Sequence, residues 1–279
     1  MILRNLKANA ILLSNMKKIY RGLPWSAVFF SAFYFFTMKS SAIGNSAMKN
    51  DGDTIEFSGY KWVTKETYGK HTGPGNNYFS GAKENAFVDK ESKLHLKLTN
   101  VDGKWYCPEV RLVEQLGYGR YYFYMDSLPQ VLDKNIVIGM FVYDLQDTTN
   151  FHNEIDIEFS KWGHDSSFNS QFVIQPEELN AFRYESNLSL KTRHMIELRK
   201  HKITFSSAYP SSDSAKASVE YIRFKKKPGY TYYTKDERVI FNVWLFRASE
   251  PSNLKEFEVI ISRFEFKPFN FFKDLMGKQ

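Results

Sequence analysis

Short segments of alternating apolar and polar residues recur along this chain from about residue 55 onward. The clearest are Lys93–Leu98, Glu109–Val113 and Tyr121–Met125, while Ile136–Tyr143 is a continuous apolar run typical of a strand buried on both faces. Glycine and proline turn signals separate these segments. The pattern predicts an all-β fold, an antiparallel jelly-roll sandwich of two packed sheets. A short helix is an alternative only over residues 177–193.

The composition fits one folded domain with no polyanionic partner. Aromatic residues make up 17% of the 279 residues, far more than a disordered chain carries. The net charge of +7 comes mostly from residues 1–42, which hold six basic residues and no acidic one. The rest of the chain has 32 basic and 31 acidic residues. Because the rest of the chain is nearly neutral, we expect no nucleic-acid partner.

Residues 1–42 have the layout of an export signal. A basic stretch that ends at Arg21 precedes the uncharged run Trp25–Met38, and small polar residues follow it. The run has 14 residues, whereas a membrane span needs ~20. Met16 is a second candidate start of translation. We expect cleavage and a secreted, periplasmic or cell-surface protein; the alternative is an uncleaved leader that anchors the protein in a membrane.

The remainder is predicted to be a linker over residues 43–54 and one sandwich domain over residues 55–279. Cys107 is the only cysteine, so no internal disulfide is expected and the thiol is interpreted as a small buried apolar group. No cluster of Cys and His has zinc-binding spacing. We expect a monomer.

The segment "NEIDIEF" (Asn153–Phe159) places Glu154, Asp156 and Glu158 at every second position. Successive side chains of a strand point to opposite faces, so the three acids share one face and the isoleucines between them can enter the core. An ordinary strand with solvated charges is one interpretation. Acidic residues are depleted in strands, however, and three on one face repel each other. The pattern therefore favours a functional role.

Two kinds of chemistry use several carboxylates. Calcium binds carboxylate and carbonyl oxygens, but a straight strand spreads its ligands instead of wrapping them around an ion. Glycoside hydrolysis with retention needs two carboxyls about 5–5.5 Å apart. Two Glu side chains whose Cα atoms lie ~13 Å apart in an ideal strand can approach each other over a curved sheet. The shorter Asp156 would then share a proton with a neighbour and separate the pKa values of the two Glu residues.

The hexapeptide "EIDIEF" resembles the active-site motif of glycoside hydrolase family 16, which includes lichenases, laminarinases, κ-carrageenases, agarases and xyloglucan transglycosylases. Its E-x-D-x-E spacing is similar to that of the lichenase and transglycosylase branches. The family fold is a β-jelly-roll with a sugar-binding cleft on its concave face. The resemblance implies that Glu154 is the nucleophile, Glu158 the general acid/base and Asp156 its helper.

Further motifs extend the resemblance over about residues 60–267. "PEVRL" and "GYGRYYFYM" resemble the lichenase succession of an E-x-R segment and a G-Y-G turn, and "MFVYD" and "FNVWLF" are similar to substrate-facing strands. The resemblance implies that sugar contacts come from these segments, at Glu109, Arg111, Phe141, Tyr143, Asn242 and Trp244. The alternatives are core packing for the aromatic residues and a surface ion pair for Glu109 and Arg111.

The chain departs from the lichenase pattern at positions that select the sugar. His152 stands where lichenases carry Trp, Val173 and Gln175 stand where lichenases have polar and aromatic glucose contacts, and Leu112 replaces the usual Thr or Ser. His152 and Gln175 are therefore candidate substrate contacts, with an exposed loop position as the alternative for His152. Because the departures fall at these positions, the resemblance does not carry lichenan specificity over to this chain, and the sequence identifies no particular polysaccharide.

These patterns together predict an exported, endo-acting hydrolase of a β-linked polysaccharide. A transglycosylase of the same fold and a non-catalytic carbohydrate-binding protein are the alternatives. The resemblance implies no required cofactor, and it leaves room for the structural calcium ion that many members carry on the convex face.

Overall fold

The computed structural model describes residues 51–128, 132–148, 151–175, 181–200, 202–209, 220–225 and 236–269, with the backbone alone over 220–225. Residues Ala47–Gln279 form one compact unit. The expected export signal lies outside the described residues. Within the described ranges, no helix has the length and the apolar composition to cross a membrane.

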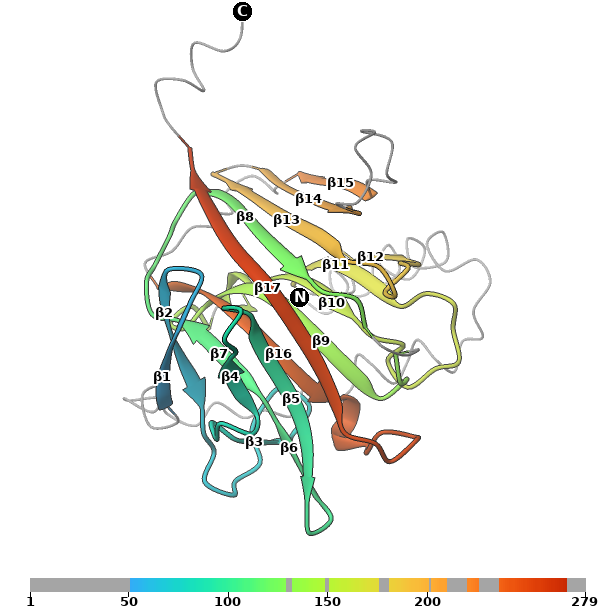
Figure 1. Cartoon of the computed structure of the whole chain (residues 1–279). Helices are drawn as coiled ribbons and strands as arrows, with labels where there is room; N and C mark the ends of the chain where they lie inside the picture. Colours follow the sequence, from blue (N-terminus) through green and yellow to red (C-terminus); the bar gives the residue numbers. More distant parts are fainter. Residues whose placement is uncertain are drawn as a thin grey trace, which may run out of the picture. The chain divides into compact units, whose positions relative to one another are not determined.

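Within its described residues, over which all strands are counted here, the unit contains two large β-sheets (Figure 1). The first sheet is antiparallel throughout and has eight strands. Their spatial order is β1 (Asp51–Phe57), β2 (Tyr60–Lys65), β7 (Glu109–Leu112), β16 (Glu237–Leu245), β9 (Ile136–Asp144), β10 (Ile155–Phe159), β11 (Ser170–Ile174) and β12 (Ala181–Tyr184).

The second sheet has nine strands, and its pairings are antiparallel except for β3 with β6. The path runs through β15 (Glu220–Lys225), β14 (Lys202–Ala208), β13 (Thr192–Arg199), β8 (Gly119–Met125), β17 (Phe257–Pro268), β5 (Leu94–Val101), β6 (Lys104–Cys107) and β3 (Tyr78–Phe79), with β4 (Ala86–Val88) beside β5. Neighbouring strands are often distant in sequence, as the predicted jelly-roll requires.

Alternation along the strands builds the core between the sheets. Ile155, Ile157 and Phe159 of β10 are fully buried, which confirms the apolar face expected for this strand. Across the core, Trp62 of β2 packs 5.5 Å from Phe264 of β17 in the other sheet, measured between ring centroids. The apolar run of β9 is buried over nearly its whole length, so the prediction of a strand covered on both faces is correct.

Cys107 is a free, buried cysteine. Burial raises the pKa of its thiol to about 12, so the side chain stays protonated and packs as an apolar group. This confirms the interpretation made from the sequence.

The structure differs from the expected element boundaries in two places. Strand β1 begins at Asp51 and pairs with β2, for example Thr54 with Val63, so the end of the expected linker over 43–54 belongs to the sheet. The suggested short helix is wrong over its described part, because Ala181–Tyr184 form the edge strand β12. Pairing with β11 decides the conformation there, which local sequence signals do not report.

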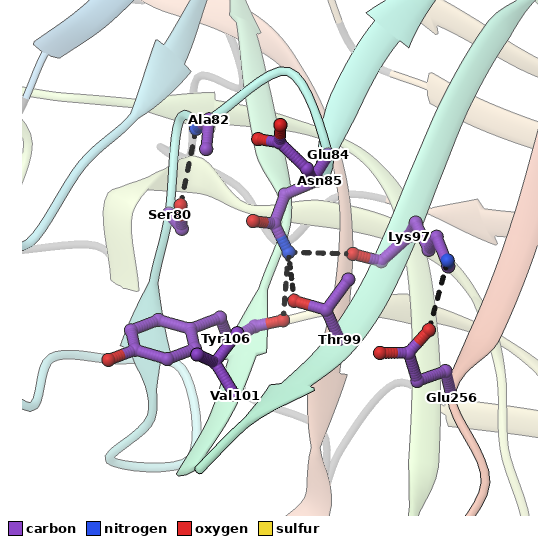
Figure 2. A pocket seen from close by; sticks show the side chains of 9 residues that line it. All are labelled: Ser80, Ala82, Glu84, Asn85, Lys97, Thr99, Val101, Tyr106 and Glu256. Carbon is purple, nitrogen blue, oxygen red and sulfur yellow. Dashed lines mark hydrogen bonds and ion pairs between the residues drawn. The ribbon is translucent and has the colours of Figure 1, made fainter.

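A pocket of about 430 Å³ lies on the nine-stranded sheet, between β5, β6 and the loop that precedes β4 (Figure 2). The Asn85 amide crosses this region and donates to the carbonyls of Lys97 and Tyr106 and to Thr99 Oγ1. One buried side chain thus ties the loop to two strands. Lys97 Nζ pairs with Glu256 Oε2 at 2.9 Å on the rim.

Candidate active site

Strand β10 presents its acidic side chains on the face opposite the core. Asp156 is 2% exposed, and Glu154 and Glu158 are half-buried. Glu154 immediately precedes the strand, and its carbonyl accepts the Gln175 backbone N–H at 3.0 Å, which continues the pairing with β11. The alternation deduced from the sequence therefore places all three carboxyls along one line of the sheet.

Strand register aligns a second set of side chains across the sheet at the level of Glu158. We call this set the Glu158 row; from β12 to β7 it contains Arg183, Gln171, Glu158, Gly139, Asn242 and Glu109.

The Glu158 row is held together by hydrogen bonds on both sides of Gly139. On one side, Gln171 Nε2 donates to Glu158 Oε2 at 2.5 Å and Arg183 Nε donates to Gln171 Oε1 at 3.0 Å. On the other side, Asn242 Nδ2 donates to Glu109 Oε2 at 3.2 Å. Lys65 Nζ, from β2, lies 3.1 Å from Glu109 Oε1. Glu109 is thus a nearly buried hydrogen-bond acceptor within the row, and Lys65 compensates its charge.

Gly139 contributes no side chain to the row, and the Asn242 amide occupies the space beside it. A Cβ placed there would lie 2.5 Å from Asn242 Oδ1 and 3.3 Å from the Phe141 ring. Asn242 is 1% exposed, and its Oδ1 has no hydrogen-bond partner in the described structure. A buried acceptor without a donor is costly. A hydroxyl from water or from a ligand would complete the bonding of Asn242.

Asp156 has mostly apolar neighbours across the sheet: Val173 on β11, Phe141 on β9 and Ile240 on β16. Its Oδ2 accepts the Gln175 amide at 3.0 Å. Burial raises the pKa of Asp156 well above its usual range, and the charges of Glu154 and Glu158 raise it further. This environment favours the binding of a proton by Asp156.

That proton is shared with Glu154. Burial, and then the charge of Glu158, raise the pKa of Glu154 to about 8, while a hydrogen bond from Asp156 lowers it. The two carboxyls hence titrate as a pair. With the proton on Asp156, Glu154 accepts a hydrogen bond and carries the negative charge.

An aromatic stack borders Glu154. The rings of Tyr143 and His152 are stacked, with centroids 4.4 Å apart and planes inclined by 14°. His152 Nδ1 donates to the Asp144 carbonyl at 2.8 Å. Burial, and then the charge of Glu154, raise the pKa of the Tyr143 hydroxyl, so this side chain stays neutral. His152 therefore supports Tyr143 with its ring face.

The backbone before Glu154 is in a conformation that non-glycine residues rarely adopt. Phe151, His152 and Asn153 have φ values of 51°, 56° and 46°, each at a cost of order 1–3 kcal/mol. Contacts to Asp147 hold the turn: its carbonyl accepts the His152 N–H at 2.8 Å and its Oδ2 accepts the Asn153 amide at 2.7 Å. The turn thereby fixes where β10 begins.

The remaining candidate contacts lie toward the β1 side of the sheet. Arg111 Nη2 donates to both carboxylate oxygens of Asp51, at 2.7 and 2.9 Å. Trp244 is partly buried against the core, and a Cβ at Gly75 would lie 2.7 Å from its Cε3. Arg111 is thus engaged by a residue that the sequence assigned to the linker, and Trp244 packs under the loop between β2 and β3.

Three residues of the site were not anticipated: Gln171, Arg183 and Gly139. Gln171 precedes Val173 and Gln175 at the same two-residue spacing, so this period could have identified it. Arg183 falls in the segment where a helix was an alternative, and nothing local marks Gly139 as the neighbour of Glu158. The described residues contain no group of three or more His, Cys, Asp or Glu arranged to hold a metal ion; the calcium site remains a prediction.

No family model and no curated relative matches this sequence. Solved structures do match. A beta-glucanase of Bacillus licheniformis superposes with a TM-score of 0.57 at 17% identity, over 78% of this chain and 99% of that one. The mixed linkage glucan PUL GH16 protein of Bacteroides ovatus, in complex with a G4G4G3G product, gives a TM-score of 0.54 at 14% identity, over 74% and 94%.

A third similar structure is described as an immunostimulatory antigen and pseudo beta-1,3-glucanase of Mycobacterium tuberculosis, with a TM-score of 0.57 at 13% identity over 75% of this chain and 91% of that one. Identities this low establish architecture only. Together with the two-sheet topology and the register around β10, they show that this chain has the β-jelly-roll fold of family 16 glycoside hydrolases.

Proposed function

We propose that the protein is an endo-acting hydrolase of a β-linked, glucan-like polysaccharide and that it works with retention by double displacement. One observation carries the proposal: Glu154, Asp156 and Glu158 lie on one face of the sheet, where burial raises the pKa of Glu154 and Asp156 and Gln171 holds Glu158 by a hydrogen bond. A retaining glycosidase needs this division between an ionised nucleophile and a proton donor.

In the first step, Glu158 protonates the leaving glycosidic oxygen while Glu154 attacks the anomeric carbon. The glycosidic C–O bond breaks, and a covalent glycosyl-enzyme forms. In the second step, Glu158 removes a proton from water, which attacks the anomeric carbon and releases Glu154. Asp156 keeps its proton on the Glu154 side, so that Glu154 is charged when it attacks.

The row geometry supports a substrate that crosses the strands. Asn242 lies in the Glu158 row, next to Gly139. Among the described strands of this sheet, five lie on one side of β10 and two on the other. A polymer bound across them would extend on both sides of the catalytic strand, which is what endo cleavage requires. We expect the protein to act as a monomer outside the cytoplasm, after cleavage of its leader, with no cofactor.

The test is incubation of the chain from residue 43 with β-1,3-, β-1,4- and mixed-linkage glucans, xyloglucan and sulfated galactans. Products are identified by mass spectrometry, and anomeric configuration is followed by proton NMR. We expect new reducing ends of oligosaccharides, with the β configuration formed first. Inverted products, or no turnover on any polymer, would contradict the proposal. Transfer products at high acceptor concentration would instead indicate a transglycosylase.

A non-catalytic carbohydrate-binding protein is the second candidate, because one similar structure is named a pseudo beta-1,3-glucanase. Binding to a glucan without turnover would favour it. The crowding of three carboxyls argues against it, because carbohydrate binding alone does not require like charges that repel each other to be held together.

Replacement of Gly139 by Ala is expected to lower kcat/KM roughly 10- to 100-fold. The new Cβ would lie 2.5 Å from Asn242 Oδ1, so the Asn242 amide must move away from the position in which it would bind the sugar. Steady-state kinetics on the best polymer measure the effect. Gly73→Ala is the matched control, because a Cβ there meets no atom within 4 Å. Equal activity of both variants would show that the position of the Asn242 amide does not matter for substrate binding.

A further inference from the structure

The Glu158 carboxylate is tied to the edge of the sheet through two consecutive hydrogen bonds. Gln171, 1% exposed, donates from Nε2 to Glu158 and accepts at Oε1 from Arg183. The two ends of a Gln amide have nearly the same shape but opposite hydrogen-bonding character. Only one orientation of this amide offers Arg183 an acceptor, and the same orientation presents a donor to Glu158.

Arg183 is itself fixed from the other side. Its guanidinium carbon lies 4.6 Å from the centroid of the Trp162 ring, within the range of a cation–π contact. Trp162 is 8% exposed, and its backbone N–H donates to Ser160 Oγ at 2.9 Å. A buried indole thus provides the base on which the guanidinium lies, directly across from Gln171 on the neighbouring strand.

We propose that Arg183 is a positioning residue for the acid/base step, which fixes the direction of the Gln171 amide and through it holds the Glu158 carboxylate. The inference rests on the proposed function for the role of Glu158, but the contacts that carry it do not. Arg183 acts on Glu158 through Gln171.

The charged groups around Glu158 have opposing effects on its protonation. Glu154 and Asp156, on its own strand, favour its protonated form. Arg183 from β12 and the Gln171 donor from β11 favour its ionised form, which the second step needs as a base. Strand β9 contributes only Gly139, and further along the row Glu109 is neutralised by Lys65. Loss of Arg183 should therefore leave Glu158 protonated up to a higher pH.

The direct test is carboxyl NMR of the unliganded protein with ¹³C-labelled Glu, in which Glu158→Gln assigns the signal of Glu158. In Arg183→Met, which keeps the stem on Trp162 but loses the donor, the titration midpoint of Glu158 should rise by about one pH unit. Arg183→Lys should restore part of the difference. Arg263→Met is the matched control, since Arg263 lies 4.1 Å over Tyr124 on the other sheet. An unchanged midpoint in Arg183→Met overturns the inference.

Kinetics give the second readout. On a polymer, the basic limb of the kcat/KM profile should move to higher pH in Arg183→Met, because kcat/KM reports the free enzyme and its proton donor. On a dinitrophenyl glycoside, whose leaving group needs no proton, the variant should match the parent protein. An equal loss on both substrates would show a merely structural effect and overturn the inference. Absence of turnover in the parent protein overturns the proposed function instead. The NMR titration midpoint would still show whether Arg183 acts on Glu158 through Gln171.

Discussion

Replacement of Glu158 by Gln should lower kcat/KM on a natural polymer by roughly 10³-fold or more, because general acid–base catalysis contributes about 10²–10⁴-fold and Gln has no proton to donate. Glu154→Gln should lower it at least as far, since no nucleophile remains to form the glycosyl-enzyme. Both substitutions conserve shape and remove a like charge from a crowded face, so the variants should fold. Initial rates of oligosaccharide release measure the effect.

Chemical rescue separates the two roles. With a dinitrophenyl glycoside, Glu158→Ala still forms the glycosyl-enzyme, and azide should intercept it to give a glycosyl azide of retained configuration. With Glu154→Ala, azide must attack the substrate itself and give the inverted product. Matching circular dichroism spectra and unfolding midpoints serve as controls. Full activity in either Gln variant, or the same azide stereochemistry in both Ala variants, would refute the assigned roles.

Asp156→Asn should lower kcat/KM roughly 10²-fold and flatten the pH dependence of stability. A carboxyl whose pKa is raised on folding stabilises the folded state while it is protonated. The contribution is complete below its unfolded pKa of about 4, and it is lost as the pH rises through the folded value, about 8 for Glu154. The free energy of unfolding of the parent protein should thus fall between pH 4 and 8.

The amide of Asn can still accept from Gln175 and donate to Glu154, but it has no proton to lose. The parent protein should therefore lose on the order of 1–3 kcal/mol more than Asp156→Asn over this range. Urea unfolding at several pH values gives the comparison. Asp133→Asn is the control, because hydrogen bonds, first from Ser252, hold the pKa of Asp133 low. Loss of this carboxylate should lower the free energy of unfolding above about pH 4, and it should not change how that free energy varies between pH 5 and 8. Parallel curves for parent and Asp156→Asn would exclude the shared proton.

The sequence pattern within a single strand was sufficient to predict which side chains share a face and which are buried. The period of two in β10 separates Glu154, Asp156 and Glu158 from Ile155 and Ile157 without any knowledge of the neighbours, and the apolar run of β9 reports burial on both faces. Recurrent strands then leave few architectures that bury two such faces, which is why the jelly-roll could be predicted.

Properties that depend on register could not be predicted. Glu158 meets Gln171 and Gly139 because three strands pair in one alignment, and a slip by a single residue would present other side chains. Arg183 joins the row only because its segment becomes an edge strand, against the local alternative of a helix. The likeness of motifs indicated Arg111 as a sugar contact, but it does not report that Asp51 engages this guanidinium.

That last contact bears on how the protein should be produced. Asp51 is the first residue of β1 and forms an ion pair with Arg111 at 2.7 Å. A protease that removed the start of β1 would therefore leave Arg111 without this partner and would also disrupt the edge strand. A recombinant chain that starts at Ile55 would look complete by its sequence pattern yet carry this uncompensated charge. One that starts at residue 43 keeps the native partner of Arg111.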